Sequence, residues 1–178
     1  CQSLKLLLLK NQEMDENHCR VLGIFSRPDL EIALDDCKIT SAGASALAEV
    51  LGRNQGPTNL ECCEIDNAVL ADGLRVNNRL NFLKPRFSSN FEAAAREFLA
   101  VADAVKGNKG LVDLDRRCGI SLNDVVWGAI CDSLEAHQTL EVLGLSRERF
   151  TDPTAAPALL ISQIQKLVDM MKVNTSIH

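Results

Sequence analysis

The sequence predicts an α/β solenoid, in which one short strand and one helix alternate along the chain. In the segment LEIALDDCKITSAGASALAEVL at 30–51, Leu30, Ile32 and Leu34 recur at every second position, the period of a strand with one buried face. Four apolar residues three and four positions apart then indicate one face of a helix. Similar strand-like starts recur along the chain at intervals of about 20 to 37 residues, which is typical of repeat proteins.

The composition suits a core made of many small, similar layers. Apolar residues make up 46% of the 178 residues, which is ample for a buried core. Aromatic residues make up only 4%, and tyrosine is absent. The core must therefore be built mainly from leucine, valine, isoleucine and alanine.

Six predicted units fill almost the whole chain. Each strand-like start follows a polar turn with Asn, Gln, Gly or Thr, and each turn follows a helix-like apolar pattern. The units span 4–29, 30–59, 60–79, 80–110, 111–139 and 140–176.

The helices of the later units are recognised by their apolar faces and start signals. Ser89 and Glu92 predict a capping box, and Ser121 opens the next helix in the same manner. Pro157 lies near the first turn of the last helix, where its missing N–H costs little. The three predicted apolar faces are Phe91, Ala94, Ala95, Phe98, Leu99, Ala102 and Val105; Leu122, Val126, Ile130 and Leu134; and Leu160, Ile164, Leu167, Val168 and Met171.

Two motifs carry a family resemblance. LEVLGL at 140–145 fits L-x-x-L-x-L, and DDCKITSAGASALAEVLGRN at 35–54 resembles the run C-x-I-T-x-x-G-A-x-A-L-A-x-x-L-x-x-N. Both are similar to leucine-rich repeats of the ribonuclease-inhibitor-like type. This class also occurs in nucleotide-binding leucine-rich-repeat receptors and in Ran GTPase-activating proteins.

The resemblance implies a right-handed, horseshoe-shaped solenoid. Parallel strands would line its concave face and helices its convex face, and each unit would bury its apolar side by stacking on its neighbours. For Cys37 and Cys118, the resemblance implies side chains that bond neighbouring backbone loops inside the ladder.

Several units depart from the pattern. The unit from Leu60 reaches the next start in only about 20 residues, and Pro85, which cannot donate to a ladder, occupies a strand position. The unit from Leu30 and the unit from Leu111 are short between strand and cysteine, which leaves their register ambiguous. Natural decay of the array and residues missing from the sequence are both open explanations. Without a recognisable polar cap at either end, we expect a fragment of a longer array.

Charge, hydropathy and cysteine usage exclude several classes of partner. The formal net charge is −5 with no long basic run, so we expect no nucleic-acid partner. No run of about 18 apolar residues exists, so we expect no membrane insertion. Seven cysteines without a CxxC motif favour reduced thiols and a cytoplasmic location.

No motif indicates catalysis or a cofactor. The sequence lacks GxxxxGK[ST], GxGxxG and GxSxG. Cys62 and Cys63 would point to opposite faces of a strand, which makes them poor joint metal ligands. His18 and Cys19 are neighbours, whereas His137 lies in a distant unit, and a solenoid keeps distant units apart. We therefore expect a protein without enzymatic activity, cofactor or metal.

The concave face is the candidate binding surface. Side chains between the inward leucines should point out of the sheet. An exposed Phe or Leu at such a position would anchor a partner. The alternative is a register slip that places the same residue in the core. The expected outward residues of the better-registered units are Leu6, Leu8, Cys62, Glu64, Phe82, Lys84, Val142 and Gly144, with Glu31, Asp113 and Asp115 as the expected equivalents in the ambiguous units.

Charge also sorts along the array. Acidic residues gather in the second and third units and basic residues in the later ones, so the face could be negative at one end and positive at the other, which would orient a partner. A solvated surface with chance segregation is the alternative. The acidic set is Glu31, Asp35, Asp36, Glu61, Glu64 and Asp66, and the basic set is Lys84, Arg86, Arg116, Arg117 and Arg147.

These observations predict a protein-interaction or scaffold module that binds a protein partner through the concave face, alone or within a large assembly. The alternative is the regulatory array of a GTPase activator or of a nucleotide-binding leucine-rich-repeat sensor, with the active domain outside this chain. The expected partner-binding residues are Glu31, Glu61, Glu64, Phe82, Lys84, Arg86, Asp113, Asp115 and Val142.

Overall fold

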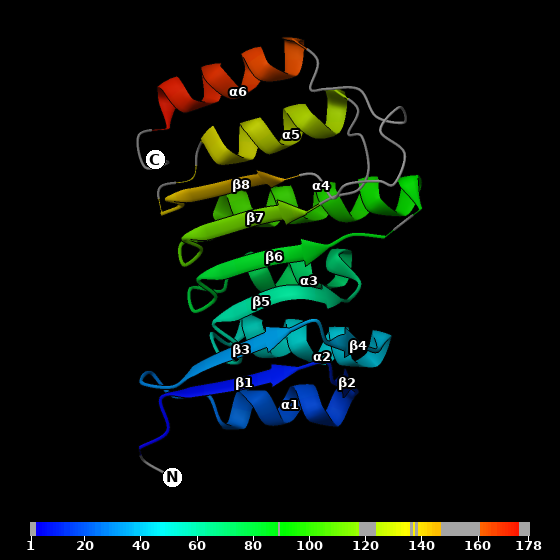
Figure 1. Cartoon of the computed structure of the whole chain (residues 1–178), viewed down its shortest axis with the longest axis vertical. Helices are drawn as coiled ribbons and strands as arrows, with labels where there is room; N and C mark the ends of the chain where they lie inside the picture. The colour runs from blue at the N-terminus through cyan, green and yellow to red at the C-terminus, as the bar shows by residue number, and fades with distance from the viewer. Residues whose placement is uncertain are drawn as a thin grey trace.

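Strands and helices alternate along the chain in the computed structural model, which describes residues 3–88, 90–117, 124–135, 137, 139–146 and 161–174 (Figure 1). The elements in chain order are β1 Leu6–Lys10, β2 Glu13–Met14, α1 Glu16–Ile24, β3 Glu31–Asp35, β4 Lys38–Ile39, α2 Ser41–Gly52, β5 Asn59–Glu64, α3 Asn67–Leu74, β6 Phe82–Arg86, α4 Phe91–Gly107, β7 Asp113–Arg117, α5 Asp124–Glu135, β8 Val142–Ser146 and α6 Ile161–Val173.

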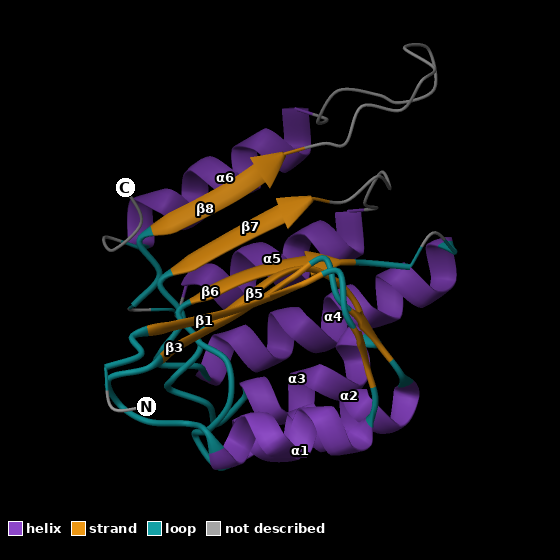
Figure 2. Cartoon of the chain, turned by 60° about the horizontal axis from the view of Figure 1, so that its bottom comes forward, coloured by secondary structure: helices purple, strands orange, loops and turns teal. Residues whose placement is uncertain are grey.

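The long strands form one curled parallel sheet, with the helices packed along one side of it (Figure 2). The strand order is β1-β3-β5-β6-β7-β8, so neighbours in the sheet are also neighbours in the sequence. Each helix packs against the next one in the same order. The predicted alternation of strand and helix is confirmed, and the arrangement is compatible with a repeat solenoid. We call the side of the sheet away from the helices the open face.

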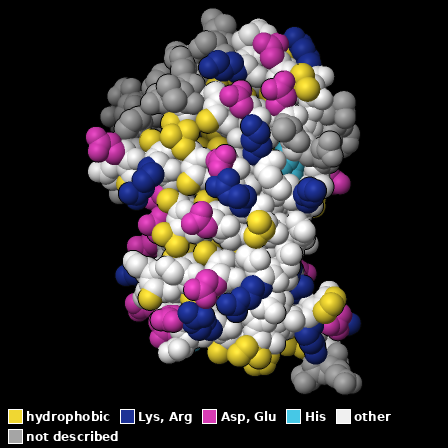
Figure 3. All heavy atoms as spheres, turned by 180° about the vertical axis from the view of Figure 1, so that it is seen from behind, with side chains coloured by type: hydrophobic (Ala, Val, Ile, Leu, Met, Phe, Trp, Pro, Cys, Tyr) yellow, Lys and Arg dark blue, Asp and Glu magenta, His cyan; other side chains and the backbone are white. Residues whose placement is uncertain are grey.

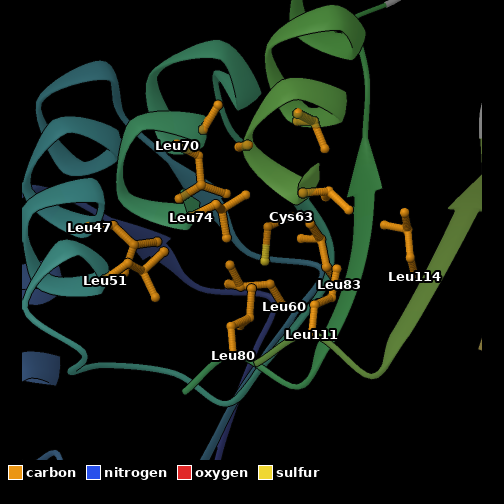
Figure 4. Packing of buried hydrophobic residues seen from close by; sticks show 14 of the residues in the cluster. Leu47, Leu51, Leu60, Cys63, Leu70, Leu74, Leu80, Leu83, Leu111 and Leu114 are labelled. Atoms are coloured by element: carbon orange, nitrogen blue, oxygen red, sulfur yellow. The ribbon is translucent and has the colours of Figure 1, made fainter. Parts of the chain in front are cut away.

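The core lies between the sheet and the helices. In the segment 30–51, Ile32 and Leu34 point inward from β3, and Leu47 and Leu51 lie on the buried side of α2. Figure 4 shows that side chains from α2 and α3 turn toward the strand leucines of adjacent units. The strand and helix periods in the sequence therefore mark the two sides of one continuous core.

A buried polar side chain recurs in the turns, three residues before a buried leucine that precedes a strand. The Asn77 carboxamide accepts from the backbone N–H of Leu80 at 2.7 Å and donates to the carbonyl of Leu51 at 2.7 Å. Asn108 repeats this arrangement, accepting from the N–H of Leu111 at 2.8 Å and donating to the carbonyl of Asn77 at 2.7 Å. These side chains join each turn to the one before it.

Histidine replaces asparagine in the next turn. Nδ1 of buried His137 accepts from the N–H of Leu140 at 3.0 Å, as the asparagine oxygens do in the earlier turns. Asn174 continues the row by donating to the carbonyl of His137 at 2.7 Å. We call Asn77, Asn108, His137 and Asn174 the turn ladder.

Two cysteines make the corresponding contacts at the other end of the strands. The thiol of Cys37 donates to the carbonyl of Leu9 at 3.4 Å, so this residue bonds to the neighbouring unit, although the acceptor lies in β1 and not in a loop as predicted. The Cys63 thiol reaches the carbonyl of Leu34 at 3.6 Å in the same way. Cys118, for which the same role was expected, lies outside the described residues.

Two helix predictions need correction. The N-cap of α4 is Asn90, whose side chain accepts from the N–H of Ala93 at 3.0 Å, whereas Ser89 lies outside the described residues. On α6, Leu167 packs against the core as predicted and Met170 is buried, whereas Val168 and Met171, which were predicted on the same face, are exposed. The side chain of Ile164 lies outside the described part. Ser121, Leu122, Pro157 and Leu160 lie outside the described residues.

Candidate binding surface on the open sheet face

The strand register decides which residues share the open face. Leu60 pairs with Leu34 on one side and with Leu83 on the other, and Leu83 pairs in turn with Leu114. All of these leucines point into the core. Because side chains alternate along a strand, the residues on either side of each leucine face outward. This places Asn59 and Glu61 on the open face.

This register corrects the predicted alignment of one unit, although Glu64 is exposed as predicted. Cys62 and Glu64 were expected as the outward pair of their unit, because Leu60 was aligned with Leu80. The register instead aligns Leu60 with Leu83, and it shifts between Glu61 and Glu64. The sequence held a signal for this alignment, since the spacing from Leu34 to Cys37 recurs from Leu60 to Cys63. The side chain of Cys62 is outside the described part of the structure.

Two rows of side chains cross the open face from strand to strand. We name the first the apolar row; it consists of Leu8, Ala33, Asn59, Phe82, Asp113 and Val142. We name the second the charged row; it consists of Lys10, Asp35, Glu61, Lys84, Asp115 and Gly144.

The apolar row exposes large hydrophobic side chains. Leu8 is 54% exposed and Val142 48% exposed, and Phe82 between them is half-buried. Leu6, in front of Leu8 on the same strand, is also exposed. The outward placement predicted for these residues is confirmed. A register slip is excluded for Phe82, because its neighbour Leu83 is the buried residue.

The charged row is largely neutralised from within. Lys10 lies 2.6 Å from Asp35, and the hydrogen bond and charge of Asp35 raise the pKa of Lys10. The ammonium group of Lys84 lies 2.5 Å from Glu61 and 3.7 Å from Asp115. The Lys84 side chain is only 7% exposed, so it offers a partner very little surface.

Acidic and basic residues meet where the predicted negative and positive ends adjoin. Besides the Lys84–Glu61 pair, Arg86 lies 3.4 Å from Asp36. Glu64, which is exposed, pairs in the ladder with Arg86. The middle of the open face is therefore a zone of mixed charge. Arg147 and the side chains of Arg116 and Arg117 fall outside the described part.

A hollow of about 550 Å³ lies where the strands begin. Glu31, Asn59, Phe82 and Asp113 contribute to its lining, so the register brings together three of the predicted binding residues with one, Asn59, that was missed. The Asn59 carboxamide donates to the Glu31 carboxylate at 3.1 Å. The hollow combines carboxylates and amides with an aromatic ring.

Asp113 is the least satisfied carboxylate of this hollow. Its Oδ1 atom is buried and accepts no hydrogen bond from any residue that the structure describes. Burial raises the pKa of Asp113, the negative charge of Asp115 raises it further, and the charge of Lys84 acts in the opposite direction. The half-buried carboxylate of Asp113 therefore carries a charge that no side chain of the described residues pairs with directly.

The cysteine and histidine side chains elsewhere that could take part in chemistry are held in structural contacts. Cys19 is fully buried, and burial raises the pKa of its thiol to about 11, which suppresses the reactive thiolate. His18 takes part in a capping box with Asp15 at the start of α1. Within the described ranges, no group of His, Cys, Asp and Glu side chains is arranged to hold a metal ion.

Two further searches bear on identity and environment. Among the described helices, none is both long enough and apolar enough to cross a membrane. Models of known protein families do not match the chain, and a search of curated proteins finds no match either.

Proposed function

We propose that this chain is a stretch of leucine-rich repeats of the ribonuclease-inhibitor-like type and that it binds a protein partner through the open, concave face of its sheet. The repeat assignment is supported by the turn ladder, which recurs three residues before the buried leucines that precede strands, and by the contacts of Cys37 and Cys63 with the backbone of the preceding strand. The right-handed sense of the coil belongs to this proposal.

The apolar row is the observation that carries the binding proposal. A sheet face exposed only to water typically carries polar side chains, yet Leu8 and Val142 are each about half exposed on this one. Burying such side chains against a partner is favourable, at roughly 25 cal/mol for each Å² of apolar surface removed from water. The row thus provides anchors spaced across the sheet.

The charged row has a supporting role. Because Lys84 is buried and already paired with Glu61 and Asp115, a partner gains little from a charge pair with Lys84. The ion pairs of the charged row instead hold its own side chains in place beside the apolar row. The centre of the proposed surface is therefore Leu8, Phe82, Asp113 and Val142, with Glu31 and Arg86 at its margins.

The helix side carries acidic and basic side chains together with exposed hydrophobic ones (Figure 3). Leu99 on α4, predicted on the buried face of its helix, is instead exposed on this side, at 38%. It offers a matched control for Val142, since both are single exposed aliphatic residues on regular elements.

Site-specific photocross-linking tests the proposal. A photoreactive phenylalanine analogue replaces Val142 in one variant and Leu99 in the other, and each is irradiated in native extract. We expect one recurrent protein to be captured from Val142 and not from Leu99, and to be displaced by excess unmodified chain. Equal capture from both positions, or capture that unmodified chain does not displace, would contradict binding by the open face.

A further inference from the structure

We propose that Asp113, with Phe82 and Val142 beside it, forms a site for a cationic side chain, a lysine or an arginine, from the partner protein. This inference rests on the proposed function and names the chemistry of what the open face binds. The register places Phe82 and Val142 on the strands that flank Asp113, in the same row of the sheet.

The first argument is the state of the carboxylate. The Oδ1 atom of Asp113 is buried in the open face, and no donor of the described residues reaches it. The side chain as a whole is only half-buried, so a cation from a partner can reach the accessible part of the carboxylate and compensate the charge that Oδ1 leaves unmatched. The raised pKa of Asp113 agrees with this, because it reflects an ionised form that its surroundings do not compensate.

The second argument is the charge balance of the face. Each basic side chain described there already has an acidic neighbour, as Lys10 has Asp35, Lys84 has Glu61, and Arg86 has Asp36. Lys5, which lines the hollow itself, lies 3.3 Å from Asp29. In the described part of the chain, Glu31 and Asp113 are within ion-pair distance of no basic side chain. The uncompensated charge around the hollow is therefore negative, which favours a cation over a neutral donor.

The third argument is the apolar surface around the carboxylate. Lysine and arginine carry long aliphatic stems that pack on apolar surface while their charged ends reach a polar group. Phe82 and Val112 line the hollow together with Asp113, and exposed Val142 lies on its other side in the row. A stem lying against Phe82 or Val142 brings its charged end to Asp113, and the Phe82 ring adds a cation–π contact.

The test uses a phage-displayed library of random peptides selected on the whole chain. We expect the selected peptides to share a lysine or arginine flanked by apolar residues. Asp113→Asn keeps the shape of the side chain and removes its charge. It should weaken the binding of a synthetic peptide from the selection by about tenfold or more. Asp103→Asn, the same change on exposed α4, should leave the affinity unchanged.

A second measurement does not depend on how the Asp113 variant folds. Replacing the basic residue of the peptide by norleucine keeps an aliphatic stem and removes the charge. We expect this change to weaken binding to the unaltered chain by about tenfold, and to have little effect on Asp113→Asn, because the two changes remove the same interaction.

The outcomes separate this inference from the proposed function. Peptides that lack basic residues but lose affinity in Val142→Asp would overturn the cationic site and leave binding by the open face intact. Peptides that are insensitive to Val142→Asp and to Asp113→Asn would overturn both. Basic peptides weakened equally by Asp103→Asn would show general charge attraction, which also contradicts a site at Asp113.

Discussion

Gly144 and Asp115 show how closely the side chains of the open face are fitted. Gly144 is the neighbour of Asp115 in the charged row, and a Cβ atom at Gly144 would lie 2.5 Å from Oδ1 of Asp115. The same carboxylate takes part in the ion pair with Lys84. A residue without a side chain on β8 therefore leaves the space in which Asp115 reaches Lys84.

Gly144→Ala should destabilise the fold by about 1–3 kcal/mol, because the added methyl group displaces Asp115 from its place beside Lys84. Urea unfolding followed by circular dichroism measures the change. The control is Gly52→Ala at the end of α2, where a Cβ atom would meet nothing closer than 4.0 Å. Equal effects at the two glycines would contradict this account of the charged row.

The turns between the helices and strands are held by the turn ladder. All four members are buried. Asn77 and Asn108 each bond both to their own turn and to a carbonyl of the preceding unit, His137 accepts from a backbone N–H of its own turn, and Asn174 donates to the carbonyl of His137. The ladder lies at the opposite end of the strands from Cys37 and Cys63. The units are thus joined by hydrogen bonds at both ends of the sheet, in addition to the strand ladder.

Asn108→Ala should cost about 2–4 kcal/mol, because it leaves the carbonyls of Leu74 and Asn77 and the N–H of Leu111 without their buried partner. Urea unfolding of this variant is compared with that of Asn17→Ala, a change at an exposed position of α1. The account fails if the two variants unfold at the same urea concentration.

His137 makes one rung of the ladder sensitive to pH. Burial lowers the pKa of His137 below its usual 6.5, so the neutral imidazole is favoured in the folded state. The unfolded chain then binds more protons, and His137 contributes stability that is present above pH 6.5 and is lost as the pH falls through the lowered folded-state pKa.

His137→Asn should reduce this pH dependence, because asparagine fills the other described rungs without titrating. The free energy of unfolding is measured for both proteins between about pH 7.5 and 5.5, above the range in which most carboxylates titrate. The unaltered chain should lose more stability than His137→Asn over this range. Parallel curves would mean that His137 is not a titrating rung.

The sequence predicted the order of strands and helices because the spacing of the buried leucines is visible in it. They recur at a period of two in strands and about 3.6 in helices. It did not predict the register of β5, where Cys62 and Cys63 are adjacent and the ladder shifts between Glu61 and Glu64. Ser89 and Asn90 are both good capping residues, so composition alone could not choose between them.

The candidate surface was predicted only in part, for a related reason. The outward direction of Leu8, Phe82 and Val142 follows from alternation within one strand. The burial of Lys84 depends on Glu61 and Asp115, which lie on the two neighbouring strands. Such contacts between units depend on the strand register, which a single sequence does not specify by itself.

Across the described part of the molecule, one face of the sheet carries no helix and is crossed by an apolar row that runs from β1 to β8. Because the strands belong to successive units, this row extends across the array and places its anchors on several units at once. A partner lying along the row would contact Leu8 on the first strand and Val142 on the last. This extended contact is the central claim of the account.

The affinity of the protein captured by cross-linking, measured for the unaltered chain, Val142→Asp and Leu99→Asp, tests that claim most directly. We predict that Val142→Asp weakens binding by about tenfold or more, because it places a charge among apolar side chains that the partner buries. Leu99→Asp on the helix side should leave the affinity unchanged. Unchanged affinity for Val142→Asp, with the loss confined to Leu99→Asp, would place the binding surface on the helices and contradict the account.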